Sequence, residues 1–227
     1  MYVMKFFPLI FAIIPLSCQP LIMREKTDHI ILAINDLTEG IKQFKELTGI
    51  EPIFGGVHPN TFTQNALVAI DNGSYLEIIA PRSDIGSIPD WIKKLDKLTP
   101  YGWAVTSYDI EGTQKKLKNN GLAVTVSAAG SRKTSSGGLL SWTTFGMEDK
   151  DSSVYPFFIK WGSDVIHPSQ TTPEGCKLSA IHIHSDDKDI LAFKDLLKLD
   201  FLVKVDSVSK LVFQIESPKG KVVFEGN

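Results

Sequence analysis

One layout of elements, a strand followed by a helix and three short strands, recurs three times along the chain. In the first unit an apolar run at 29–34 indicates a buried strand, and a helix is expected from its cap at Asp36 to the left-handed stop at Gly49. Residues 55–60 are expected to form a loop, and strands at 65–70 and 75–80 flank an Asp-Asn-Gly turn that is typical of a hairpin. Paired units of this kind commonly close a cupped sheet around a small molecule, so the repeat predicts a pocket.

The second and third units follow the same plan with different residues. The second has a predicted strand at 102–108, a helix from Asp109 to a stop at Gly121, strands near 122–127, a glycine and serine loop at 130–138, and strands at 139–145 and 155–161. The third has a strand at 177–184, a helix from about Asp187, and strands at 201–205, 210–216 and 222–225. Because the match lies in pattern and not in identity, an α+β meander without a true repeat is the alternative.

Composition and charge narrow the classes of protein to consider. With 227 residues, of which 43% are hydrophobic, the chain can bury a substantial core in one body or in two fused halves. Its formal net charge is -2 and charges of both signs are interspersed, so the basic stripe that a phosphate backbone requires is missing. We therefore expect a small-molecule ligand and no binding to nucleic acid. The oligomeric state stays open, with a homodimer as one alternative.

The first residues differ in kind from the rest. Lys5 precedes an apolar stretch that is too short to span a membrane and ends in small residues, which predicts an export signal over 1–18. The Leu-Ser-Cys-Gln sequence at 16–19 resembles a bacterial lipoprotein signal, in which Cys18 carries the lipid. We expect a protein exported to the cell envelope whose one membrane attachment is this lipid. A buried N-terminal strand or an uncleaved anchor is the alternative, and without a signal the protein would be cytoplasmic. Lipidation would leave Cys176 alone, so no disulfide is expected.

Glu77 is the strongest candidate for chemistry. It sits between apolar residues on a predicted interior strand, where a carboxylate must face a polar cavity or find a partner, because burying it alone is costly. An edge position that faces solvent is the alternative. His29, at the start of the first strand, can pair with Glu77, since the first and last strands of such a unit can lie side by side. Imidazole and carboxylate donors suit zinc, and manganese, iron or nickel would also accept them.

Further residues have the character of pocket parts. Arg132 lies in the predicted glycine and serine loop, where a guanidinium can close over an anionic group. Trp142 and Trp161 follow on the next strands, and each alone is more often a core residue than a ligand platform. Together with His58 and Asn65, they supply the few convergent polar groups that an apolar small-molecule cavity needs.

Two other motifs give weaker evidence for a functional site. His182 and His184 alternate with isoleucines, so both point to one face of a strand. They could form half of a metal site, but a wet outer face is favoured because no carboxylate accompanies them at ligand spacing. The glycine pairs at 55–56 and 137–138 do not form a phosphate-binding loop, since the lysine and hydroxyl positions are missing. A hydrolase nucleophile elbow is missing as well.

Several segments carry a resemblance to a known family. They are DHIILAI at 28–34, GGVHP at 55–59, NAL at 65–67 and YLEIIAP at 75–81, with GSR at 130–132 and LSW at 140–142 as later echoes. In these segments the chain is similar to the glyoxalase-like domain family of the vicinal oxygen chelate superfamily. The resemblance implies an α+β fold, in which repeated βαβββ modules form a cupped mixed β-sheet barrel with helices packed outside. It implies a paired-module domain over 27–165, and we expect 176–227 to add a third, shorter module to the same body.

The resemblance also implies a metal site, of which this chain has half. His29 and Glu77 match the ligand positions of the first module. The second module places Gly102 opposite His29 and a residue near Phe158 opposite Glu77, and neither binds metal. His58, His167 or a histidine of the third unit would have to complete the set. Arg132 and His58 match family motif positions that we interpret as substrate contacts.

These observations favour a small-molecule enzyme of lyase, isomerase or dioxygenase type. It would act on an oxygen-rich substrate, with or without a divalent metal. Glu77 would serve as metal ligand or general base, and His29 or His58 would assist proton transfer. Asn65, Arg132, Trp142 and Trp161 would bind the substrate. A metal-free protein that sequesters an aromatic or oxygenated compound is the alternative, and an envelope scaffold for a protein partner is a third.

Overall fold

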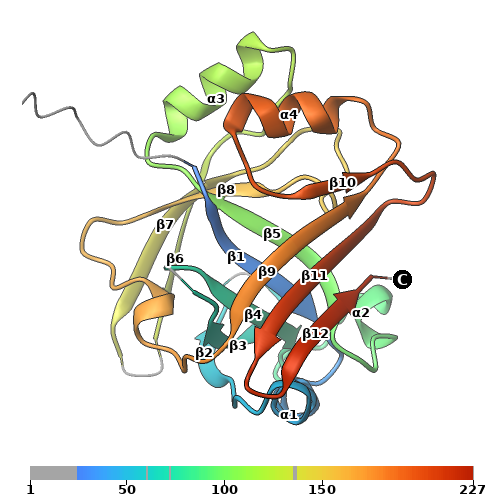
Figure 1. The fold of residues 1–227 in the computed structure, drawn as a ribbon. Helices are drawn as coiled ribbons and strands as arrows, with labels where there is room; N and C mark the ends of the chain where they lie inside the picture. The colour runs from blue at the N-terminus through green and yellow to red at the C-terminus, as the bar shows by residue number, and fades with distance from the viewer. Residues whose placement is uncertain (1–24, 60, 72, 135–136, 227) are drawn as a thin grey trace, which may run out of the picture.

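The computed structural model describes residues 25–59, 61–71, 73–134 and 137–226 of the chain (Figure 1). The predicted signal segment and Cys18 lie outside these ranges, so export and lipid attachment stay predictions from the sequence. No helix within these ranges is both long enough and apolar enough to cross a membrane.

The first two units form one curved, mixed sheet. Its strands are β1 (Thr27–Ala33), β2 (Ile53–Val57), β3 (Thr63–Ala69), β4 (Tyr75–Pro81), β5 (Thr99–Thr106), β6 (Ala128–Lys133), β7 (Leu139–Phe145) and β8 (Phe157–Trp161). They lie in the order β2-β3-β4-β1-β5-β8-β7-β6. In each unit the first and last strands pair in parallel, β1 with β4 and β5 with β8, and antiparallel pairing of β1 with β5 joins the units. The two halves therefore share one strand order, which confirms the predicted α+β fold of paired βαβββ modules.

Helices cover the outside of this sheet. These outer helices are α1 (Leu37–Thr48), α3 (Ile110–Asn119) and α4 (Asp189–Leu197). The short α2 (Asp90–Lys93) instead packs its Ile92 against Ile31 and Ile79 on the other face of the sheet. A 3-10 turn, η1 (Pro168–Gln170), follows β8. Phe44 of α1, Leu117 of α3 and Phe193 of α4 share a buried core with Ile30 and Leu32 of β1. Because side chains alternate along a strand, the residues between these two face the opposite, concave side of the sheet.

The predicted helix caps are confirmed. The Asp36 carboxylate accepts a hydrogen bond from the Glu39 amide at 2.8 Å, and Gly49 ends α1 with a φ of 83°. Asp109 accepts from the Gly112 amide at 3.1 Å at the start of α3. A left-handed residue without a Cβ and a short acceptor side chain are the usual ways to satisfy helix ends, and both were readable from the sequence.

The third unit forms a second sheet from β9 (Lys177–His184), β10 (Leu202–Lys204), β11 (Lys210–Ser217) and β12 (Gly220–Glu225). The elements follow the predicted order, but the strands lie in the order β10-β9-β11-β12, which differs from the order within the first two units. Figure 1 shows this sheet crossing in front of the larger one. Phe213 and Phe224 belong to the same core as α1, and Phe224 stacks on Phe44 with ring centroids 6.1 Å apart.

Three of the predicted segments are wrong, and two of them depended on glycine. The glycine and serine stretch expected to be a loop at 130–138 begins inside β6, and 122–127 forms only an isolated bridge from Val124 to Met147. A Cβ on Gly130 would lie 2.3 Å from the Trp142 indole nitrogen, so the glycine makes room for a tryptophan of the paired strand. Residues 55–57, also expected to be a loop, belong to β2, whose pairing with β3 shifts register between Phe54 and Gly56. Glycine at an irregular point of a strand marks close packing here, not a turn.

Candidate active site

A cavity of about 210 Å³ opens on the concave face of the eight-stranded sheet; we call it the inner cavity. Both modules contribute to it, and so do all the site residues predicted from the sequence. These are His29, His58, Asn65, Glu77, Arg132, Trp142 and Trp161. The inner cavity is thus a single chamber in which the predicted polar and aromatic groups meet.

Strand alternation places the polar groups of the first module. His29 and Ile31 of β1 face the inner cavity, as do Tyr75 and Glu77 of β4. The parallel register sets His29 beside Tyr75 and Ile31 beside Glu77, so the imidazole and the carboxylate are diagonal neighbours. The His29 and Tyr75 rings stack with centroids 4.5 Å apart, which fixes the plane of the imidazole.

Glu77 is buried, with 6% of its surface exposed, and is surrounded by nitrogen atoms. Its Oε1 accepts a hydrogen bond from Asn65 Nδ2 at 2.6 Å and lies 3.1 Å from His58 Nε2, while its Oε2 lies 3.7 Å from His29 Nε2. Burial raises the pKa of Glu77, but the hydrogen bond from His58, the charges of His58 and His29 and the bond from Asn65 outweigh burial and lower that pKa to about 2. The carboxylate is therefore ionised at neutral pH and is a weak proton acceptor.

Asp28 hydrogen-bonds the ring nitrogen of His29 that points away from Glu77. Its Oδ1 lies 2.7 Å from His29 Nδ1, and its Oδ2 accepts from Thr106 Oγ1 at 2.9 Å and from Trp161 Nε1 at 3.1 Å. Burial raises the pKa of Asp28, but hydrogen bonds from His167 and His29 and their charges hold it well below its ordinary value. An ionised Asp28 favours the His29 tautomer with the proton on Nδ1, which leaves the Nε2 lone pair facing the inner cavity.

Sequence reasoning missed Asp28 as a site residue. Simple alternation assigns Asp28 to the face opposite His29, and an aspartate at the start of a strand carries no signal of its own. The pairing of β1 with β5 shifts register between Thr27 and His29, so alternation does not hold at this point. The nearest sequence signal was the adjacency of an acid and a histidine at 28–29.

The second module supplies an aromatic wall and a cation. Trp142 and Trp161 pack edge to face with centroids 5.7 Å apart, and the Phe157 ring lies 5.4 Å from that of His29. Arg132 of β6 reaches across to β2, where its Nη1 donates to the Gly55 carbonyl. This bond links the two edge strands of the sheet, so Arg132 helps to close the barrel around the inner cavity.

The second module does not supply metal ligands. The amide of Ile34 donates to the Ile79 carbonyl in the first module, and the amide of Ser107 donates to the Ile159 carbonyl in the second. Aligning these two bonds sets Gly102 opposite His29 and Phe157 opposite Glu77. Phe158, next to the equivalent position, packs in the core. Hydrogen and phenyl groups cannot coordinate a cation, so the residues present do not fit a metal held by both modules. In the described ranges no group of three or more histidine, cysteine, aspartate or glutamate residues is arranged to hold a metal ion.

The other histidines lie outside the inner cavity. His167 Nε2 is 3.4 Å from Asp28 Oδ2, on the far side of that carboxylate from His29. His182 and His184 lie on β9 in the second sheet, where His184 Nδ1 is 3.5 Å from Asp206 Oδ2 and the isoleucines that alternate with the histidines enter the core. Neither β9 histidine reaches the site.

The chain is similar to one family model and to several solved structures. The model of a family described as a glyoxalase-like domain matches residues 27–196. A hypothetical protein from Staphylococcus aureus has 17% sequence identity and a TM-score of 0.61, and the match covers 89% of this chain and 86% of that chain. A methylmalonyl-CoA epimerase variant from Streptomyces coelicolor, in complex with 2-nitronate-propionyl-CoA, has 20% identity and a TM-score of 0.44 over 59% of this chain and 95% of that chain. Methylmalonyl-CoA epimerase from Mycobacterium tuberculosis has 15% identity and a TM-score of 0.44 over 60% and 85% of the two chains. No curated protein matches the chain.

Proposed function

The chain belongs to the glyoxalase-like domain family of the vicinal oxygen chelate superfamily, and from this premise we propose that it is a proton-transfer enzyme of isomerase or lyase type. Its substrate is a small oxygen-rich compound with a carbonyl group. The observation that carries the proposal is the buried Asp28–His29 pair, whose free imidazole nitrogen lies 3.7 Å from the Glu77 carboxylate inside the inner cavity.

In this proposal His29 is the general base. Its Nε2 takes a proton from the carbon next to the substrate carbonyl, and the proton stays on the imidazole until it is returned. Asp28 orients the ring and stabilises the imidazolium, in the way that a third group commonly supports a catalytic base. Glu77 stabilises the same positive charge from the opposite side. Glu77 itself is not the base in this proposal, because hydrogen bonds and neighbouring positive charge keep the pKa of its carboxyl low.

Negative charge that develops on the substrate oxygen needs donors, and the same wall offers them. Asn65 Nδ2 carries two N–H groups, of which one donates to Glu77 Oε1 at 2.6 Å. His58 Nδ1 lies 2.8 Å from the Thr63 hydroxyl, which can donate to it and leave Nε2 as an N–H donor 3.1 Å from the same Glu77 oxygen. Prearranged donors in a buried site stabilise a developing oxyanion far more than donors in water do. In the proposal Asn65 and His58 therefore hydrogen-bond the substrate oxygen. Trp142 and Trp161 of the aromatic wall pack on the rest of the substrate.

Sequestration without turnover is a second candidate, and the composition of the second module favours it. Phe157, Trp142 and Trp161 make that side of the inner cavity aromatic, which suits an aromatic ligand whether or not it reacts. In that function the buried histidines and carboxylates would only hydrogen-bond the ligand.

Hydrogen–deuterium exchange distinguishes the two functions. The probe is 2-hydroxyacetophenone, which has two vicinal oxygens, an aromatic ring and exchangeable methylene protons that NMR follows in D₂O. We expect the protein to accelerate loss of the methylene signal, and His29→Gln and Glu77→Gln to lower the rate by about 100-fold or more. His184→Gln, a matched change outside the inner cavity, should exchange at the wild-type rate.

The opposite result is as clear. If the ketone binds, as heats of titration would show, but exchanges no faster than in buffer, the enzyme proposal is wrong and sequestration stands. Exchange that persists at the full rate in His29→Gln would remove His29 from its assigned role.

A further inference from the structure

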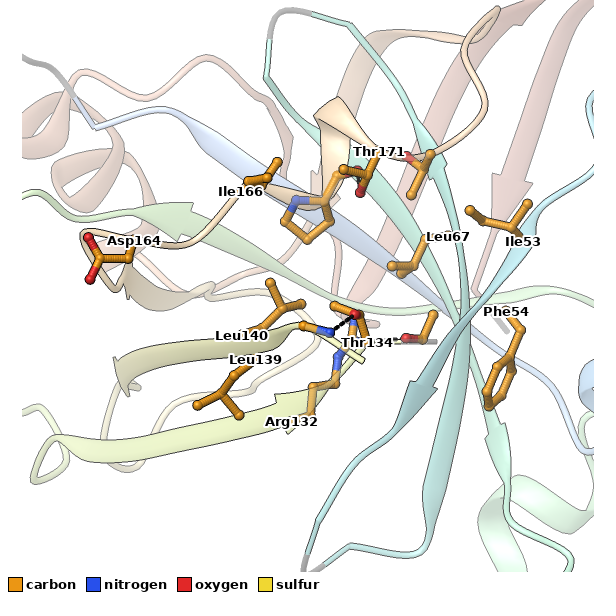
Figure 2. A pocket seen from close by; sticks show the side chains of 14 residues that line it. Ile53, Phe54, Leu67, Arg132, Thr134, Leu139, Leu140, Asp164, Ile166 and Thr171 are labelled. Carbon is orange, nitrogen blue, oxygen red and sulfur yellow. Dashed lines mark hydrogen bonds between the residues drawn. The ribbon is translucent and has the colours of Figure 1, made fainter. Parts of the chain in front are cut away.

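A second cavity, which we call the outer cavity, lies beside the inner one and has a volume of about 380 Å³. Figure 2 shows the side chains that line it. It is bounded by β2, by β6 and β7, and by the segment at 164–172. Arg132 lines both cavities, so the guanidinium stands at their junction. Whatever occupies the outer cavity therefore meets this cation.

The outer cavity collects apolar side chains that solvent reaches. Phe54 of β2, Leu139 of β7 and Ile166 of the last segment are 44%, 64% and 62% exposed, and all three line it. Leu67 and Leu140 form its deeper wall. Scattered exposed apolar residues need no explanation, but three from separate segments that converge on one hollow mark a ligand site.

Arg132 is a buried cation with little compensation from the protein. Only 5% of its surface is exposed, and its Nη1 donates to the Gly55 carbonyl. A guanidinium has five N–H donors, and a buried charge is stable when it is paired. The negative charge of Glu77 favours the charged guanidinium electrostatically, yet no ion pair in the described part of the chain includes Arg132. An anion from outside the protein would supply the partner.

The position of the Arg132 guanidinium depends on two glycines. A Cβ on Gly56 would lie 2.9 Å from Arg132 Nη1, and the φ of 144° at Gly56 is one that other residues rarely adopt. A Cβ on Gly55 would lie 2.5 Å from Asn65 Oδ1. The sequence Gly55-Gly56 thus lets β2 approach the guanidinium and the polar wall, and any larger side chain would displace one of them.

We propose that the ligand is an amphipathic carboxylate, whose carboxylate pairs with Arg132 and whose hydrocarbon part fills the outer cavity. As an identification of substrate class, this rests on the proposed function. A single guanidinium matches a monoanion in charge and in planar geometry. A phosphate would bring a second negative charge close to Glu77, and Asp164 at the open rim disfavours an anion at that end. A volume of 380 Å³ is about a dozen times the share of one water in the liquid, which is enough for a chain of about eight carbons.

Calorimetric titration at pH 7 tests the charge requirement with octanoate, 1-octanol, octyl phosphate and acetate as probes. We expect octanoate to bind most tightly of the four. Arg132→Gln should weaken octanoate binding by about tenfold or more and leave 1-octanol unchanged, because only the charged hydrogen bonds are lost. Binding of 1-octanol or octyl phosphate as tight as that of octanoate would overturn the proposal.

A second variant tests the hydrocarbon site without touching the barrel closure. Leu139→Ser changes an exposed side chain, so the fold should persist, and octanoate should bind about fivefold more weakly while acetate is unaffected. Leu191→Ser on α4, where the leucine is 53% exposed, is the matched control and should bind as wild type. If Arg132→Gln unfolds, Leu139→Ser decides alone, and an unchanged affinity there would refute the outer-cavity site.

The same titrations separate this inference from the enzyme proposal. Glu77→Gln removes a nearby negative charge and should bind octanoate at least as tightly as wild type. Wild-type protein that binds octanoate with the predicted dependence on Arg132 and Leu139, yet fails to exchange the protons of 2-hydroxyacetophenone, would refute the enzyme and leave the ligand class standing.

Discussion

Replacing Glu77 by glutamine should flatten the loss of stability in acid. The pKa of Glu77 falls from 4.5 to about 2 on folding, so its ionised form stabilises the fold above pH 4.5, and that contribution is lost as the pH falls toward 2. A shift of this size is worth about 3 kcal/mol in full, and about 2 kcal/mol of it disappears between pH 5 and pH 3. The side chain is 8% exposed, so solvent screening is small.

Urea unfolding of wild type and Glu77→Gln at pH 5, 4 and 3 measures this difference. The wild-type free energy of unfolding should fall by about 2 kcal/mol more than that of the variant over this range. Glu111→Gln, which removes an exposed carboxylate on α3, is the control and should track wild type. Parallel curves for wild type and Glu77→Gln would show that the carboxylate is not held ionised by its neighbours. The roles assigned to His58, Asn65 and His29 around Glu77 would then be wrong.

Two predictions concern the fold. Gly40→Ala should lower the free energy of unfolding by about 1 to 3 kcal/mol, because the new methyl would lie 2.8 Å from Ile34 Cγ2 and 3.1 Å from Ile78 Cγ2. Gly86→Ala, where no atom lies within 4 Å, should change that free energy by less than about 0.5 kcal/mol in the same urea series. Phe213→Ala should lower it by about 3 to 5 kcal/mol with a single transition by both circular dichroism and fluorescence, since both sheets share one core. Two separate transitions would contradict the shared core.

Much of the fold could be predicted because its signals are local. The caps Asp36 and Asp109 and the stop at Gly49 mark helix ends through contacts within one turn, and short apolar runs mark β1 and β4. His29 and Glu77 could be paired from the sequence because the first and last strands of such a unit can lie side by side, as β1 and β4 do. Strand order in the third unit has no local signal, because the pairing of β9 with β11 depends on how the second sheet packs on the core.

The wrong predictions at 55–57 and 130–138 and the missed residue Asp28 share a physical cause. Each depends on close packing between neighbouring strands, which is defined only once the sheet has formed. Gly130 indicates a loop when taken alone, but it gives space to the Trp142 indole of the neighbouring strand. Gly56 lies at a shift of register beside Arg132, and Asp28 lies at another beside His29. A one-residue shift changes which face a side chain reaches, and nothing in the period of the sequence announces it.

The unequal walls of the inner cavity have a consequence for the reaction. Two halves with the same strand order would, with matched residues, accept a ligand in two orientations related by the pseudo-twofold axis. Here His29 and Glu77 stand on one wall, while Gly102 and Phe157 occupy the equivalent places on the other. In the proposed reaction, a carbonyl compound would therefore bind with its oxygen toward the first module and its apolar part toward the second. Because the proposed base, His29, lies on one wall only, it would remove one of the two protons of a prochiral methylene, and the exchange should be stereospecific.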